Sequence, residues 1–239
     1  MPKKVSELSV FFPFWNEEEN VDIIVKNAIP IAENIAKKWE IIIIDDGSSD
    51  NTLKIAEKLA LEDPRIRVFS HQPNRGYGAA LKAGLTHARY NLIVFIDGDG
   101  QFDFSEVTRF IEKIDNADIV IGFRKKRRDR NLFKRLLLMN LLKVWDFALF
   151  RFSFKDIDCG FKMFKKEAAE KLMPLRSEGA MITTEILAKA KKKNLKIEEI
   201  GVTHYQRERG HQSGANFPVI VRAVLESFIL WFDLHYGRT

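Results

Sequence analysis

The sequence contains a single cysteine, Cys159, in 239 residues. It therefore cannot form an internal disulfide or a cysteine-based metal site, and it suits a reducing compartment. No run of about 18 apolar residues is present, so we expect no membrane-spanning helix. The N-terminal residues Met1 to Lys4 lead into a strand-like run without the apolar core of a secretory signal. These absences favour a cytoplasmic location.

Two common nucleotide-binding motifs are also missing. No glycine-rich loop ends in Gly-Lys-Ser/Thr, and no Gly-x-Gly-x-x-Gly follows the first expected strand. A basic nucleic-acid-binding module is the alternative from another class, but no RNA-recognition aromatic motif is visible, so we expect no nucleic-acid partner. The 39 Lys and Arg outnumber the 33 Asp and Glu, which gives a net charge of +6. This excess favours anionic partners such as nucleotides or phospholipids.

Apolar strands alternate with helical patterns through residue 122. The patterns predict strands at 8–12, 40–44, 66–69, 92–96 and 119–121, and helices at 17–38, 50–61, 78–88 and 106–114. We expect Pro30 to kink or split the first helix. The alternation predicts an α/β fold, with a mostly parallel sheet flanked by helices. Ligands bind beyond the carboxyl ends of the strands in such sheets.

Polar clusters follow three of these strands, at 13–17, 45–48 and 97–99. The strongest is Asp97-Gly98-Asp99, because two carboxylates after a buried strand are costly unless a cation neutralises them. A hard divalent cation takes such oxygen ligands together with a diphosphate, and Gln101 adds a neutral oxygen. A solvated turn also explains the tripeptide by itself. Its position directly after an apolar strand favours the metal site.

Two further loops have dual interpretations. Ser49 or Asp50 is expected to cap the next helix, but a cap does not explain Asp45 and Asp46, whose carboxylates can accept hydrogen bonds from a base or ribose. The glycine-bearing loop at 74–80 opens a helix. It suits either an anion at a helix N-terminus or a simple turn.

The pattern changes after residue 122. Segment 124–135 holds eight Lys or Arg and one Asp, and the run up to residue 154 is apolar with large side chains. A buried helix pair with a charged edge is one interpretation. We favour an in-plane amphipathic element on anionic lipid, because the basic cluster adjoins the aromatic-rich run. Beyond it we expect a return to the sheet at 156–164, helix at 165–194, extended chain at 196–204 and an apolar helix at 218–234. That last helix joins the membrane surface, packs on the protein or forms a homodimer.

The ordered segments 13–17, 45–48, 74–76, 97–101 and 122–124 resemble family 2 glycosyltransferases with the GT-A fold. Within that family the chain is most similar to the dolichyl-phosphate mannosyltransferase and polyprenyl-phosphate glycosyltransferase branch. Later motifs agree with this: Asp156 to Lys162, Glu185, His204 to Arg207, Gly210, and Ser213-Gly214. Three features depart from the family pattern. Trp15 replaces a usual Tyr, Gln206 replaces a common Pro, and the spacing from Gly210 to Ser213 suits the bacterial-type subgroup better than the dolichol one.

The resemblance implies a role for each matching residue. The nucleotide-sugar would be bound by Pro13, Trp15, Glu17, Asp45, Asp46, Gly47, Asn74 and Gly76. Mg²⁺ or Mn²⁺ on the donor diphosphate would be held by Asp97, Asp99 and Gln101. The catalytic group would comprise Asp97, Asp99, Arg124 and Arg207, and the acceptor side would comprise Arg124, Arg128, Arg135, Asp156, Glu185 and Ser213.

The resemblance also implies one GT-A domain over 1–239. We divide it into a nucleotide-sugar-binding half (1–122), a basic amphipathic membrane-facing segment (123–155), an acceptor-side half (156–217) and a C-terminal helix (218–239). The implied reaction moves a hexose from a GDP- or UDP-sugar to a polyprenyl phosphate, dolichyl or undecaprenyl, with inversion. The protein would lie peripherally on the cytoplasmic face of a membrane. The alternative is a soluble or lipid-linked glycan acceptor, which would need Asp156 or Glu185 as a general base.

Overall fold

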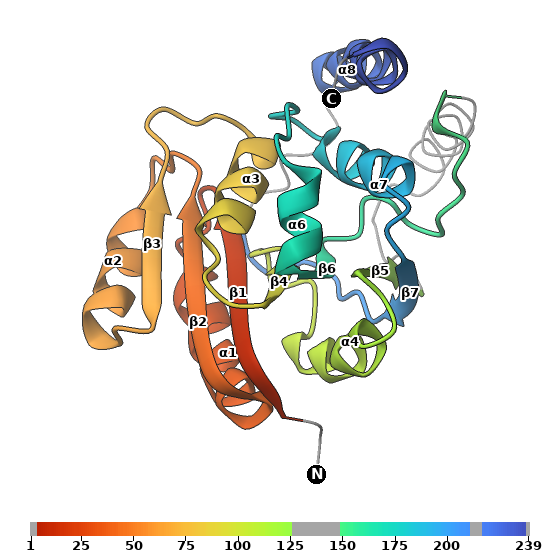
Figure 1. Cartoon of the computed structure of the whole chain (residues 1–239). Helices are drawn as coiled ribbons and strands as arrows, with labels where there is room; N and C mark the ends of the chain where they lie inside the picture. Colours follow the sequence, from red (N-terminus) through yellow and green to blue (C-terminus); the bar gives the residue numbers. More distant parts are fainter. Residues whose placement is uncertain (1–3, 126–148, 211–216, 238–239) are drawn as a thin grey trace.

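The structure, a computed structural model, describes residues 4–125, 149–210 and 217–237 (Figure 1). Its first part alternates strands and helices: β1 Val5–Phe14, α1 Val21–Ile35, β2 Ala36–Asp45, α2 Thr52–Glu62, β3 Ile66–Ser70, α3 Tyr77–His87, β4 Leu92–Ile96, a 3-10 turn η1 Phe104–Glu106, α4 Val107–Ile114 and β5 Ile119–Arg124. The second part contains β6 Phe161–Lys165, α6 Lys166–Leu172, α7 Ile182–Lys192, β7 Ile197–Val202 and α8 Phe217–Tyr236.

The strands form one seven-stranded sheet in the order β3-β2-β1-β4-β6-β5-β7. Strands β3, β2, β1 and β4 pair in parallel, and β5 pairs in parallel with β7. This confirms the expected α/β fold with a mostly parallel sheet. Strand β6 is the exception, because it lies between β4 and β5 and runs antiparallel to both. The sequence pattern did not predict this inversion.

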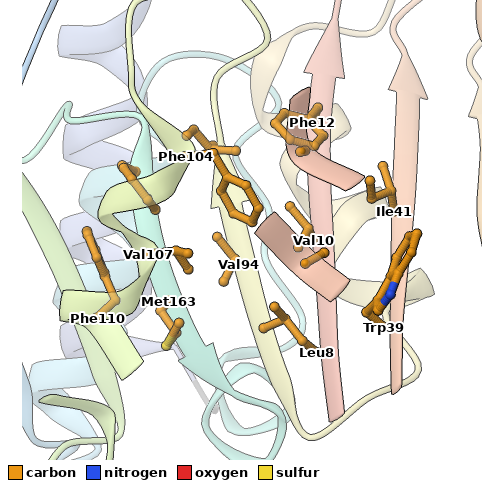
Figure 2. Packing of buried hydrophobic residues seen from close by; sticks show 14 of the residues in the cluster. Leu8, Val10, Phe12, Trp39, Ile41, Val94, Phe104, Val107, Phe110 and Met163 are labelled. Atoms are coloured by element: carbon orange, nitrogen blue, oxygen red, sulfur yellow. The ribbon is translucent and has the colours of Figure 1, made fainter. Parts of the chain in front are cut away.

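The strands are buried on both faces, so adjacent side chains enter two different cores. On β1, Val10 and Phe12 join the core under α1, α2 and α4 (Figure 2), whereas Phe11 joins the core under α3, α6 and α7. Continuous runs such as Ile41 to Ile44 supply both cores at once, which is why they show no polar alternation.

The first helix is shorter than predicted. The chain forms a turn before Val21, and the strand that follows starts at Ala36, where it pairs with Val5. Pro30 lies inside α1 but does not split it. The helix buries side chains at three- to four-residue spacing against the sheet, and this packing outweighs the lost backbone hydrogen bond. The buried positions are Val21, Val25, Ala28, Ala32 and Ile35.

The predicted helix at 165–194 is wrong as one element, because it is divided into α6 and α7. The connection between them is fixed by Glu185, whose carboxylate accepts the backbone N–H groups of Arg176 and Ser177 at 2.8 to 3.0 Å. The strands expected within 156–164 and 196–204 and the C-terminal helix are confirmed as β6, β7 and α8. Most of the predicted amphipathic segment lies outside the described residues. No helix in the described ranges has both the length and the apolar character needed to cross a bilayer.

Candidate active site at the carboxyl edge of the sheet

The sheet topology brings the polar motifs to one edge. Strands β1, β2, β4 and β5 run in the same direction, so the segments that follow them emerge together. Strand β6 runs the opposite way and begins at this edge, which places 156–160 beside 97–101. This convergence explains why motifs far apart in the sequence make up one site.

Asp97 lies between two elements that hold its carboxylate. The hydroxyl of Tyr77, in the first turn of α3, donates to Asp97 Oδ1 at 2.9 Å. On the other side, the backbone N–H of Asp97 donates to Gly160 O at 2.8 Å. A Cβ added at Gly160 would stand 1.8 Å from Asp97 Oδ2. The carboxylate therefore occupies the space that any side chain at position 160 would need.

The second carboxylate lies two residues further on. Asp99 Oδ1 accepts the backbone N–H of Gln101 at 3.0 Å. The side-chain amide of Gln101 donates to the backbone carbonyl of Tyr205 at 3.0 Å, and the backbone carbonyl of Gln101 accepts the Tyr205 N–H at 2.8 Å. These bonds tie the loop after β4 to the segment after β7. They also leave the amide oxygen of Gln101 as the atom suited to a ligand.

The electrostatics of this pair fit a divalent cation. Burial and the neighbouring charge of Asp99 raise the pKa of Asp97 to about 7. A raised pKa means that the negative charge on Asp97 is unfavourable without a nearby positive charge. A hard divalent cation, which prefers oxygen ligands, would supply that charge. No group of three or more His, Cys, Asp or Glu side chains with metal-binding geometry occurs among the described residues. A cation here would therefore need additional oxygens from a ligand such as a diphosphate.

A cavity of about 300 Å³ opens beside this pair. Asp97 and Asp99 contribute to one wall, and helix α1 with the segment 205–209 contributes to the others. The carboxylates are thus accessible from a space large enough for part of a ligand.

The acidic pair Asp45 and Asp46 at the end of β2 makes hydrogen bonds within the protein. Asp46 Oδ2 accepts from the Asn74 amide at 2.9 Å and from the Gly76 N–H at 2.8 Å. Its Oδ1 lies 2.7 Å from His71 Nδ1 and accepts the Arg75 N–H at 3.1 Å. A carboxylate has about four acceptor positions, and all are used here. Asp46 therefore holds the loop that positions Tyr77.

Asp45 is similarly engaged. Its carboxylate accepts from Ser70 Oγ at 2.9 Å and lies 3.3 Å from the Ser48 N–H. Gly47 has a φ of +69°, and a Cβ there would lie 2.5 Å from Asn74 N. The residues predicted to bind nucleotide after β2 and β3 thus lie together in one hydrogen-bonded network. Whether they also contact a nucleoside stays a prediction.

The predicted donor residues of 13–17 lie at the end of β1 and directly after it. Pro13 is half-buried, and Trp15 is 44% exposed, so its ring is available for stacking. Glu17 is buried and pairs with Arg207, and its Oε2 accepts from Asn20 at 2.6 Å. Burial raises the pKa of Glu17, and the bonds from Asn20 and Arg207 offset this only in part. Two residues expected to contact substrate independently therefore contact each other.

Arg124 and Asp156 form the clearest ion pair of the site. Arg124 Nε and Nη2 donate to the two Asp156 oxygens at 2.6 and 2.8 Å. Burial alone would lower the pKa of Arg124, but the carboxylate outweighs it and raises that pKa further. The guanidinium is permanently charged and held in one orientation at the end of β5.

Of the remaining acceptor predictions, only Glu185 lies among the described residues, and its contacts lie elsewhere. Glu185 is fully buried under the 173–178 connection and forms an ion pair with Lys189 at 2.8 Å. Burial acts to raise its pKa, but Lys189 and the backbone donors of that connection lower it overall. Arg128, Arg135 and Ser213 lie outside the described residues.

Three residues of the site were not assigned from the sequence. Tyr77 and Gly160 hold Asp97, and Lys162 lies fully buried beneath them on β6. A lysine between the apolar residues Phe161 and Met163 of a buried strand was the available signal. Contact of Tyr77 and Gly160 with Asp97 could not be anticipated, because it depends on the α3 position and the β6 inversion.

The mostly parallel sheet with flanking helices matches the GT-A fold of solved glycosyltransferases. Among solved structures, the glucosyl-3-phosphoglycerate synthase of Mycobacterium tuberculosis, crystallised with Mn²⁺ and UDP-glucose, matches with a TM-score of 0.66. The match covers 95% of this chain and 79% of that one at 19% identity, so it supports the fold alone.

The chain belongs to glycosyl transferase family 2, whose sequence profile matches residues 9–173. It is 34% identical over 224 residues to a dolichyl-phosphate beta-glucosyltransferase of Saccharomyces cerevisiae, with 83% of this chain and 67% of the relative covered. It is 28% identical over 238 residues to a dodecaprenyl-phosphate galacturonate synthase of Rhizobium johnstonii, with 98% and 69% covered. The chain thus spans about two thirds of the length of these relatives. The family expected from the motifs is confirmed.

Replacing Gly160 by alanine should inactivate the enzyme without unfolding it. The new methyl group would displace the Asp97 carboxylate, and a shift of about 1 Å in a catalytic group costs roughly 100-fold in rate. We expect sugar transfer to fall at least about 100-fold, with a circular dichroism spectrum like that of the wild type. Gly179→Ala is the matched control, because its Cβ would make only ordinary contact with Glu226 at 3.5 Å. Full activity of Gly160→Ala would contradict the geometry described for Asp97.

Replacing Asp97 by asparagine should stabilise the metal-free protein at alkaline pH. The folded-state pKa of about 7 exceeds the unfolded value of 3.8. The folded wild type therefore loses stability as the pH rises between these values, on the order of 4 kcal/mol in total at about 1.4 kcal/mol per unit. Asparagine carries no charge and avoids this loss. Urea unfolding in EDTA should show Asp97→Asn more stable than the wild type near pH 8, with the advantage disappearing near pH 4.

A control of opposite sign is available at Asp63. Its hydrogen bonds from Arg65 lower its pKa, so Asp63→Asn should destabilise the protein near pH 8. Equal pH profiles for the wild type and Asp97→Asn would show that Asp97 is not the strained carboxylate inferred here.

Proposed function

We propose that this protein transfers a hexose from a nucleoside diphosphate sugar to the phosphate of a polyprenyl lipid, with inversion at the anomeric carbon. The observation that carries this proposal is the carboxylate pair Asp97 and Asp99 at the carboxyl edge, with the oriented Arg124 guanidinium at the end of β5 on the same edge. The names of the relatives, which act on dolichyl and dodecaprenyl phosphates, support the acceptor class.

The donor would bind over the ends of β1 and β2. Trp15 offers an exposed ring for stacking on a base, and the loop held by Asp46 shapes the adjacent surface. Arg207 would exchange its bond with Glu17 for a phosphate oxygen, since the two acceptors compete for the same guanidinium.

Mg²⁺ or Mn²⁺ would be held by Asp97, Asp99 and the Gln101 amide oxygen together with the donor diphosphate. When bound, such a cation stabilises the negative charge that develops on a departing diphosphate. The structural neighbour crystallised with Mn²⁺ and UDP-glucose supports a divalent ion of this kind. Tyr77 and Gly160 contribute by keeping the Asp97 carboxylate in place before any ligand arrives.

The acceptor would approach from the side of Arg124. A phosphate monoester is largely ionised at neutral pH, with a second pKa of about 6, so it needs no general base. Its oxygen attacks the anomeric carbon as the bond to the diphosphate breaks. Arg124, oriented by Asp156, offsets the repulsion between the two anions.

A glycan hydroxyl as acceptor fits this site less well. That reaction needs a free carboxylate as general base. Asp156 uses both oxygens on Arg124, and Glu185 is buried beneath the 173–178 connection. Neither predicted base is free to accept a proton from a substrate.

The direct test compares acceptors with one radiolabelled donor at a time, drawn from UDP- and GDP-hexoses with Mn²⁺. We expect label in the lipid fraction with undecaprenyl or dolichyl phosphate, and none with the corresponding alcohol or with a free oligosaccharide. EDTA should abolish transfer, and added Mn²⁺ or Mg²⁺ should restore it. Transfer to the alcohol or the oligosaccharide at a similar rate would refute the phosphate acceptor.

The C-terminal helix supports a location on a membrane surface. Its described side chains form an apolar stripe at helical spacing, in which Ile229 is 63% and Phe232 is 58% exposed. Leu230 and Leu234 on the opposite side are buried in the core under α7. Burying the stripe in a lipid interface would remove this apolar surface from water. The stripe comprises Leu225, Phe228, Ile229, Phe232 and Tyr236.

The double variant Ile229→Glu/Phe232→Glu should lose vesicle binding. We expect the wild type to float with liposomes containing phosphatidylglycerol and the variant to remain with the unbound protein, with about a tenfold loss or more. Leu61→Glu is the matched control, because Leu61 is 88% exposed on α2 at the opposite end of the molecule. Equal flotation of both variants and the wild type would rule out this stripe as the contact.

A further inference from the structure

Lys162 is a buried cation that no step above uses. It is fully buried on β6, between β4 and β5, where it lies opposite Phe95 and Ile121. Within the described part of the chain, no other Lys or Arg side chain is buried to this degree. Burying an ammonium group costs several kcal/mol unless it is paired and hydrogen-bonded. A lysine at this position therefore needs a specific compensation.

That compensation comes from the loop before β6. Lys162 Nζ donates to the backbone carbonyl of Cys159, and it lies 5.8 Å from the ring centroid of Phe95. Three carboxylates of the site, those of Asp97, Asp156 and Asp158, interact with its charge. Burial lowers the pKa of Lys162, and these negative charges act against that decrease.

The bond to Cys159 has a direct consequence for the acidic pair. Cys159 precedes Gly160, whose carbonyl accepts from the Asp97 N–H at 2.8 Å and whose Cα adjoins the Asp97 carboxylate. The same loop begins with Asp156, which orients Arg124. One ammonium group is thus attached to the segment that touches the proposed metal ligand and also positions the proposed acceptor arginine.

We propose that Lys162 is a positioning residue for the transfer reaction. By holding the Cys159 carbonyl, it fixes segment 156–160 beneath Asp97, and its charge balances the carboxylates gathered there. The proposal rests on the proposed metal-binding role of Asp97. It makes Lys162 responsible for the geometry of the site.

The test replaces Lys162 by methionine and measures stability, metal binding and turnover separately. Removing one member of a buried group of charges leaves the others uncompensated, as well as the Cys159 carbonyl. We therefore expect Lys162→Met to unfold at a lower temperature than the wild type, and metal binding and turnover are compared at a temperature where both proteins are folded. Titration of free Mn²⁺ by electron paramagnetic resonance, with UDP or GDP present, should show about tenfold weaker binding, as is typical when a supporting partner of a metal ligand is lost. We expect kcat to fall about 100-fold.

The sign of the Mn²⁺ effect separates two roles. A lysine that acted only through its charge would repel the cation, so its removal would tighten Mn²⁺ binding. Weaker binding indicates lost geometry. Tighter or unchanged binding with wild-type kcat would overturn the proposal.

Two further variants keep the test decisive. Lys165→Met, on the same strand but only half-buried, should match the wild type in all three measurements. Lys162→Arg retains the charge and a donor, and it should restore Mn²⁺ binding to within about threefold of the wild type. If Lys162→Met does not fold, the comparison is made between Lys162→Arg and Gly160→Ala. The proposal is overturned if folded Lys162→Arg binds Mn²⁺ no better than Gly160→Ala does. Absence of Mn²⁺ binding by the wild type would refute the metal role of Asp97 instead.

Discussion

The close approach of the Asp97 carboxylate to the backbone of Gly160 is the contact on which the site depends. It exists because β6 runs antiparallel between β4 and β5, which turns the 156–160 segment toward the end of β4. Only glycine leaves room there for a carboxylate. Once that contact is made, Tyr77 can close the other side of Asp97, and the acidic pair is held before any substrate binds.

The charged groups of the site are neutralised by one another in the absence of ligand. Glu17 pairs with Arg207, Asp156 with Arg124, and Lys162 lies beneath three carboxylates. Among the carboxylates of the site, Asp97 has a pKa raised to about 7. Across the residues that the structure describes, the Asp97 carboxylate lacks an ion-pair partner of the kind that Glu17 and Asp156 have. This explains why a cation, together with a diphosphate, would bind beside Asp97 and not elsewhere on the edge.

Support for the site comes partly from residues that contact no substrate in our proposal. Asp46 uses its carboxylate to hold the 71–76 loop, and that loop places Tyr77 at the start of α3. Arg75 also reaches Glu178, so the same loop contacts the connection between α6 and α7. These links join the donor half of the protein to the side on which α8 packs against α7. The contacts therefore connect the loop beside the acidic pair to the part of the protein that packs against α8.

The sequence by itself determined the elements that hydrophobic patterning controls. Continuous apolar runs such as Leu92 to Ile96 predicted buried strands, and the acidic motif after that strand predicted the chemistry of the site, because strand ends of a parallel sheet converge. The GT-A class was predicted from the resemblance of the ordered motifs to family 2 glycosyltransferases. Local pattern fails where spacing along the chain carries no information about spacing in the fold.

Only the tertiary structure decided which of these residues meet. Glu17 and Arg207 pair across a separation of 190 residues. The direction of β6 depends on its two neighbours, since a short run of continuously buried residues reads the same either way along a sheet. Arg124 and Asp156 were predicted as separate acceptor residues, but the fold joins them because a buried carboxylate is stable only beside a cation. The sequence thus supplied the charges, and the sheet topology chose their partners.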